Sequence, residues 1–196
     1  MSLSGIRISN IKVSIKTDYD EHALREFAHI STSTFIHKPI TNSFFLFKLN
    51  INNHIIVVTI YYRGHVNITG LKTAKEFEDV ISIIKRVPGI SSIKSCTIDN
   101  ITASASLEIG SLYSTKLSFT ELISHIQHYP SIQTIKYSSQ KFPGAFIKFR
   151  EGGTVILFPS GKYNILGCKK LEDIHTLALS INYIIFTEIS SNKNVM

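Results

Sequence analysis

The sequence predicts an α+β protein made of two copies of one unit, each a single antiparallel sheet with helices against one face. Several runs of the chain alternate apolar and polar residues with a period of two, which is typical of strands with one buried face. Other runs carry an apolar stripe at helical spacing behind a capping residue. Both kinds of run recur in the same order after about 90 residues, a period too long for a solenoid and typical of a duplicated domain.

The first copy is expected over residues 6–89. It begins with an alternating strand and continues with a helix that Asp18 and Glu21 open. Residues 31–43, rich in Ser, Thr and Asn, are expected to form a loop. Three antiparallel strands come next, at residues 44–50, 54–61 and 65–69. Thr73 and Glu76 then have the spacing of a capping box, which predicts a second helix.

The second copy is expected over residues 93–189, followed by a polar flexible tail at 190–196. A long strand opens it, and Ser118 with Glu121 predicts another capping box and helix. The next three strands are expected at residues 142–150, 154–158 and 162–166. A final long helix starts at Leu171. In each copy the helices cover one face of the sheet, so function is expected on the other, open face.

Charge and cysteine content limit the kind of partner. A formal net charge of +7 and a pI near 9.4 favour a polyanionic partner, nucleic acid before acidic protein or membrane. Cys96 and Cys168 lie far apart and outside any CxxC or Cys/His cluster, which indicates reduced thiols. No apolar run reaches the roughly 18 residues of a membrane span, and the N-terminus lacks the apolar core of a signal peptide.

Catalysis and metal binding find little support in the sequence. No nucleophile–base grouping or carboxylate pair stands out by spacing. His125 and His128 lie one helical turn apart without a third ligand, so we interpret them as surface residues. Gly152-Gly153 is interpreted as a hairpin tip, because no helix follows it. We therefore expect a non-enzyme that uses no cofactor and no metal.

The second copy contains three short motifs: Phe142-Pro143-Gly144, Phe158-Pro159-Ser160-Gly161-Lys162 and Leu166-Gly167-Cys168-Lys169. These motifs resemble the core of the second repeat of the TATA-binding protein (TBP) family. The resemblance extends over roughly residues 6–187 and is weaker in the first copy. It implies a TBP-like saddle: two pseudo-symmetric repeats forming one curved antiparallel ten-stranded sheet, four helices on the convex face, and a DNA minor groove under the concave face.

The resemblance implies roles for residues of the concave face. Asn10 and Asn100 stand where the family has asparagines that favour A·T pairs from the minor groove. The other implied base contacts are Thr69, Thr102, Ile156 and Leu166. The rings implied to wedge between base pairs are Phe142 and Phe158 and, by spacing in the first repeat, Tyr61 with Phe44 or its neighbour Phe45. The implied phosphate contacts are Lys148, Lys162, Lys169, Lys72 and His65.

Three features depart from the family pattern. Tyr61 brings a hydroxyl to a wedge position, so insertion is expected to be shallower there. The concave face has polar residues where the family has small apolar ones, namely Lys12, Thr59, Asn67, Thr102 and Asn164. Ser138-Ser139-Gln140-Lys141 replaces the acidic residues at a loop where general transcription factors dock. These departures suit a divergent member with its own machinery, in a DNA virus or a fast-evolving parasite.

The resemblance thus implies a monomeric TBP-like transcription initiation factor of the nucleus, or of a cytoplasmic viral factory if the protein is viral. It would bind A·T-rich promoter DNA in the minor groove, bend it, and recruit initiation factors and RNA polymerase, without a membrane partner. The alternative is a TBP-fold protein-interaction module in a transcription complex with little or no DNA kinking of its own.

Overall fold

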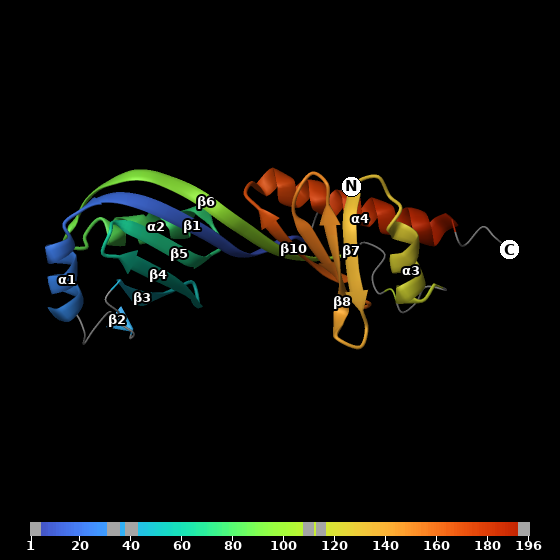
Figure 1. Ribbon diagram of the computed structural model, residues 1–196, viewed down its shortest axis with the longest axis horizontal. Coiled ribbons are helices and arrows are strands. Elements are labelled where there is room, and N and C mark those ends of the chain that lie inside the picture. The colour runs from blue at the N-terminus through green and yellow to red at the C-terminus, as the bar shows by residue number, and fades with distance from the viewer. Residues whose placement is uncertain (1–4, 31–35, 38–42, 108–111, 113–116, 192–196) are drawn as a thin grey trace. The chain divides into compact units, whose positions relative to one another are not determined.

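The computed structural model describes residues 5–30, 36–37, 43–107, 112 and 117–191, and the chain divides into two compact units (Figure 1). Residues 9–100 form the first, called here the N-unit, and residues 1–8 with 101–196 form the second, the C-unit. No described helix is long and apolar enough to cross a membrane.

The ten strands form one antiparallel sheet in the order β2-β3-β4-β5-β1-β6-β10-β9-β8-β7, which confirms the predicted fold class together with the four helices. The elements of the first half are β1 (Arg7–Tyr19), α1 (Glu21–Ile30), β2 (Ile36–His37), β3 (Phe44–Ile51), β4 (His54–Tyr61), β5 (His65–Leu71) and α2 (Ala74–Ile84). Those of the second half are β6 (Ile90–Ser106), α3 (Phe119–Ile126), β7 (Ile132–Ser138), β8 (Phe142–Phe149), β9 (Thr154–Leu157), β10 (Lys162–Cys168) and α4 (Leu171–Ser191).

Each half therefore reads strand, helix, four strands, helix. The periodicity predicts three strands after the first helix of each copy, and the structure adds β2 and β7. The two-residue β2 lies inside the segment expected to be a loop. In β7 the alternation is interrupted, because the pairing with β8 shifts register between Ile132 and Thr134 and again between Lys136 and Ser138.

The capping boxes at the start of α2 and α3 are confirmed. The hydroxyls of Thr73 and Ser118 each accept a hydrogen bond from the backbone N–H three residues on, and the glutamate there returns one to the cap. The predicted opening of α1 was wrong in one detail. Asp20, not Asp18, accepts from the Ala23 N–H. Asp18 lies within β1, which runs on to Tyr19, and its carboxylate instead accepts a hydrogen bond from Ser92 (2.6 Å) and pairs with Lys94 (2.5 Å).

The N-unit buries one face of its strands against α1 and α2. On β3, Phe45 and Phe47 are buried while Phe44, Leu46 and Lys48 are not, and β1, β4 and β5 alternate in the same way. The helices contribute the facing residues Leu24, Ala28, Val80 and Ile84. The Phe45 ring lies 5.9 Å from that of Phe27 in α1, centroid to centroid.

The C-unit repeats this one-sided arrangement. Ala145, Ile147 and Phe149 of β8 are buried, and α4 packs close to the strands. A Cβ at Gly153 would lie 2.4 Å from Leu177 Cδ1 of α4, and the φ of +75° at this position favours glycine. Cys168 is buried, and burial raises the pKa of its thiol to about 11.

Glu76, the capping glutamate of α2, is almost fully buried and ties the helix to the β3–β4 turn. Its carboxylate accepts hydrogen bonds from the backbone N–H groups of Lys72 (2.7 Å) and Thr73 (3.2 Å) and from the Asn52 amide (3.1 Å). Its Oε2 lies 3.5 Å from Nε2 of His54. Burial by itself would raise the pKa of Glu76, but these donors hold it below its ordinary value.

We expect Glu76→Gln to destabilise the N-unit by about 1–3 kcal/mol at pH 7, because the neutral amide accepts more weakly and places an N–H among donors. A carboxyl with a lowered pKa in the folded state stabilises fully above its unfolded pKa of about 4.3 and loses that contribution as pH falls through the folded value. The deficit measured by urea unfolding should therefore shrink between pH 5 and pH 3. Asp79→Asn, at an exposed pair with Lys75, serves as control. An equal deficit at pH 7 and pH 3 would contradict this account.

Candidate nucleic-acid interface

The face of the C-unit sheet away from its helices, called here the open face, is fixed by the alternation of buried and exposed residues. The register aligns one side chain from each of five strands in a row across it: Lys136, Phe146, Ile156, Asn164 and Ser104. The next row holds Thr134, Lys148, Thr154 and Leu166. The predicted base contacts Ile156 and Leu166 therefore share the open face, where Thr102 also lies between the buried residues Ile101 and Ala103.

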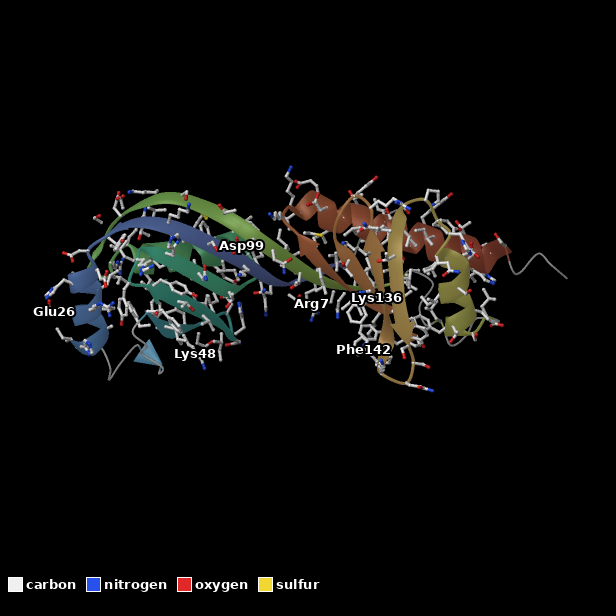
Figure 2. The ribbon with its side chains drawn as sticks, viewed as in Figure 1. Arg7, Glu26, Lys48, Asp99, Lys136 and Phe142 are labelled. Carbon is white, nitrogen blue, oxygen red and sulfur yellow. The ribbon has the colours of Figure 1, made fainter. Side chains whose placement is uncertain are left out.

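Three phenylalanine rings cluster at one end of this open face. The Phe142 centroid lies 5.8 Å from that of Phe158 and 5.3 Å from that of Phe146. Phe142 is 40% exposed and Phe146 is 39% exposed, although both are large apolar side chains (Phe142 is labelled in Figure 2). Both predicted wedge residues of the second repeat thus lie on the open face. Sequence reasoning missed Phe146, whose even spacing from Phe142 along β8 could have revealed it.

Gly144 lies next to these rings and leaves the space that they occupy. A Cβ at this position would lie 2.7 Å from Phe142 Cε1, 2.9 Å from Ile156 Cγ2 and 3.0 Å from Phe158 Cε1. The rings of Phe142 and Phe158 therefore pass close to the backbone at Gly144. This contact explains why a glycine with ordinary backbone angles stands there, since the requirement is for space.

The N-unit decides between the two wedge candidates of the first repeat. Phe45 is fully buried and its ring contacts those of Phe27 and Tyr62, so it cannot reach a ligand on the open face. Phe44 pairs with Tyr61, with ring centroids 5.4 Å apart, and both are half-buried on the open face.

The register changes one detail of this correspondence. Tyr61 and Phe158 begin equivalent turns, since the O atom of each accepts from a glycine N–H three residues later. Phe44 faces Tyr61, whereas the Ala145–Leu157 pairing puts Gly144 opposite Phe158. Phe44 therefore matches Gly144 in register rather than Phe142, and position 42 lies outside the described residues.

Asn10 is held in place by the backbone. Its Oδ1 accepts a hydrogen bond from the Gly70 N–H (2.6 Å), where the β1–β5 pairing shifts register, and Gly70 has a φ of +99°. Fixing the carbonyl oxygen orients the amide group, whose nitrogen carries two N–H donors. Asn100 and Thr69 are likewise half-buried, with Thr69 paired to Val57 on β4.

The two open faces differ in charge. The described strands of the C-unit contain no aspartate or glutamate, and Lys136, Lys148 and Lys162 are exposed on them. Lys169 follows β10 and is also exposed. In the N-unit, exposed Lys72 and His65 share the surface with carboxylates.

One of these carboxylates, Asp99, lies beside residues of the N-unit open face. The Ser14 hydroxyl donates to Asp99 Oδ2 (2.5 Å), and the Lys12 ammonium lies 3.5 Å from the same oxygen. Ser14 Oγ is also 3.0 Å from the Asn67 side chain, its partner across the strands. The predicted polar character of this face is thus an internally bonded network, and sequence reasoning did not single out Asp99.

On the helix side of the C-unit, polar side chains in and just after α3 contact a glutamate of α4. Tyr129 donates to Glu188 (2.9 Å), and His125 Nδ1 lies 3.5 Å from the same carboxylate, which links α3 to α4. Burial and this hydrogen bond raise the pKa of Tyr129 to about 12. In the described part of the chain no three His, Cys, Asp or Glu side chains are grouped so as to hold a metal ion.

We expect Gly144→Ala to rearrange the ring cluster with little cost to the fold. The added Cβ meets only side-chain atoms, two of them on exposed or half-buried rings that can move, so the loss of stability should be about 1 kcal/mol, the low end for overpacking. Urea unfolding and ring-to-ring nuclear Overhauser effects measure the two effects. Thr134→Ala, on the same face, should leave both unchanged. Retention of the Phe142–Phe158 contact in Gly144→Ala would contradict the assignment.

Comparison with known proteins agrees with this geometry. Residues 95–187 match the family model for transcription factor TFIID, or TATA-binding protein. The TBP of Methanococcus jannaschii superposes with a TM-score of 0.70 at 24% identity, covering 93% of this chain and 99% of that one.

Two further structures align over similar lengths with low TM-scores. The alpha and beta subunits of an aspartokinase give a TM-score of 0.24 at 13% identity, covering 93% of this chain and 99% of that one. The regulatory subunit of aspartate kinase from Thermus thermophilus gives 0.23 at 9%, covering 95% and 98%. Comparison with curated proteins gave no significant match. The chain has the fold of the TATA-binding proteins, and residues 95–187, in its second repeat, match the model of this family.

Proposed function

We propose that this chain binds A·T-rich promoter DNA in the minor groove, bends it, and recruits transcription machinery as an initiation factor. The observation that carries the proposal is the exposed ring cluster of Phe142, Phe146 and Phe158 on a sheet face whose described strands lack carboxylates. A base-paired duplex is a polyanion whose stacked bases form an apolar interior. It therefore suits a cationic face that carries large exposed apolar side chains.

Phe142 and Phe158 act as the wedges. A ring driven between base pairs costs a few kcal/mol of unstacking, and the bent duplex offsets this by covering more protein surface. Phe44 and Tyr61 take the same part in the first repeat, with the tyrosine hydroxyl limiting how deeply the ring enters. The four rings together kink the duplex at two places.

Asn10 and Asn100 read the groove floor, with Thr69, Thr102, Ile156 and Leu166 beside them. Amide N–H groups donate to adenine N3 and thymine O2, which both orientations of an A·T pair present, so the preference is for A·T without order. The hydrogen bond from the Gly70 N–H to Asn10 Oδ1 supports this role, because it fixes the orientation of the amide group at the open face. Lys148, Lys162, Lys169, Lys72 and His65 contact phosphates.

The partners follow from the same role. A monomer carrying two repeats presents a complete interface to DNA, and its helix side remains available to initiation factors and RNA polymerase. The exposed Ser138-Ser139-Gln140-Lys141 turn differs from the acidic docking loop implied by the resemblance, which favours dedicated partners. The protein would act where its promoter is, in the nucleus or in a viral factory.

A second function is favoured by the polar network on the N-unit. The Asp99 carboxylate beside Lys12 and Ser14, with Tyr61 as a wedge, suits a TBP-fold protein-interaction module that does little or no kinking. A salt titration separates the two. DNA binding weakens with a log–log slope near −0.9 per phosphate neutralised, whereas a protein-docking module has no measurable affinity for duplex.

We expect the double variant Phe142→Ala, Phe158→Ala to lose most of the DNA bend while retaining salt-dependent binding, because the phosphate contacts remain. Fluorescence energy transfer between dyes at the two ends of a short A·T-rich duplex measures the bend. Phe186→Ala, an exposed phenylalanine on α4, is the matched control and should bend DNA as the wild type does. An unchanged end-to-end distance with saturating wild-type protein would rule out bending.

We expect Asp99→Asn to bind duplex DNA more tightly than the wild type. The change removes a negative charge from the interface and releases Lys12, so the salt slope should steepen by up to about 0.9. Asp79→Asn makes the same change of net charge on α2, where Asp79 pairs with Lys75 at 3.0 Å, and should leave the slope as it is. Fluorescence anisotropy over a range of salt concentrations measures both. If both variants steepened the salt slope equally, the tighter binding would come from the overall net charge and not from the position of Asp99.

A further inference from the structure

A groove of about 590 Å³ in the C-unit lies beside the Phe158 wedge and contains a cation that the sequence did not single out. Its walls come from the start of β1, the end of β6, β10 and the turn before β10. Arg7 enters it from β1 and is exposed (labelled in Figure 2). Lys162, one of the predicted phosphate contacts, lines the same groove.

The lining has the chemistry of a polyanion site. It offers two cations, Arg7 and Lys162, the amide of Asn164, and the hydroxyls of Ser104, Ser106 and Ser160. No carboxylate is among the lining residues, and within the described chain no ion pair engages Arg7 or Lys162. An apolar wall is formed by Pro143, Phe158 and Pro159. Charge-assisted and hydroxyl donors opposite an apolar wall suit a chain of phosphates joined by sugars.

The corresponding groove of the N-unit, of about 630 Å³ beside Tyr61, shows the contrast. Its Arg25 is committed within the protein, with a 2.7 Å bond to Glu21 and the guanidinium 4.2 Å above the Tyr62 ring. A carboxylate therefore lines that groove and neutralises one of its cations. Arg7 makes no ion pair within the described chain, and neither does Arg63 of the N-unit groove, so the carboxylate of Glu21 is what distinguishes the two grooves. The fork of N–H donors of Arg7 is therefore available to an occupant of the C-unit groove.

We propose that the C-unit groove binds the phosphodiester backbone of one DNA strand where it passes the Phe158 wedge, with Arg7 as a phosphate ligand beside Lys162. The proposal rests on the proposed function and extends it. It places the start of the chain in the interface of the second repeat. It also gives the two repeats unequal hold on DNA, because a carboxylate, that of Glu21, lines the N-unit groove and none lines the C-unit groove.

The test uses the full chain and an A·T-rich duplex, with affinity measured by anisotropy across a salt series. Arg7→Ala should weaken binding to all duplex sequences alike and reduce the salt slope by about 0.9, as for one lost phosphate contact. Arg7→Lys should keep the slope, because it keeps the charge. Arg86→Ala removes the same group from an exposed site after α2, outside both grooves, and should bind as the wild type does.

A second measurement identifies the contact. Single neutral methylphosphonates are placed along each strand, and one position should weaken the wild type but leave Arg7→Ala unaffected, while the neighbouring position does the same for Lys162→Ala. The groove assignment alone would be overturned if Arg7→Ala showed the same salt slope as the wild type. It would also be overturned if every methylphosphonate position that weakens the wild type weakened Arg7→Ala as well. A wild-type protein without affinity for duplex would overturn the proposed function and this inference together.

Discussion

One-sided burial is the constraint on which the rest of the structure depends. In both units alternate residues of the central strands are buried in the apolar core beneath the helices, as Ala145, Ile147 and Phe149 are on β8. Because successive side chains of a strand point to opposite faces of the sheet, the remaining residues lie on the open face. A one-residue change of register would send Phe142 and Lys148 under the helices and bring the core to the surface. The position of every candidate contact is therefore set by apolar residues that touch no ligand.

The sequence predicted the parts of the fold that local signals control. The capping boxes at Thr73 and Ser118, the alternating strands and the duplicated order of elements all follow from short-range physical rules, and the structure contains them. Strand β7 was not predicted, because its pairing with β8 shifts register and the apolar–polar alternation is interrupted there. Asp18 was assigned to a helix because spacing alone cannot show that β1 continues past it. Both errors concern where an element ends, which depends on its partners in space.

The same distinction holds for the site. Phe142 and Phe158 could be placed from their motifs, but choosing Phe44 over Phe45 required the register against Tyr61. The pairing of Lys12 with Asp99 joins residues 87 positions apart, so it could be found only from the structure. Long-range pairs of this kind give the two repeats different surfaces although their elements match. The C-unit face is aromatic and cationic, while the N-unit face is polar and partly neutralised.

We propose above all that the aromatic side chains of the C-unit open face enter the base stack of the duplex. A fluorescent adenine analogue, 2-aminopurine, placed at single steps of an A·T-rich duplex tests it most directly, since its emission rises when its neighbours unstack. We predict a rise at two separated steps on saturation with protein, and none at the steps between them. Saturated binding, verified by anisotropy of the same duplex, with emission unchanged at every step would show that the rings stay outside the stack, and would contradict the account.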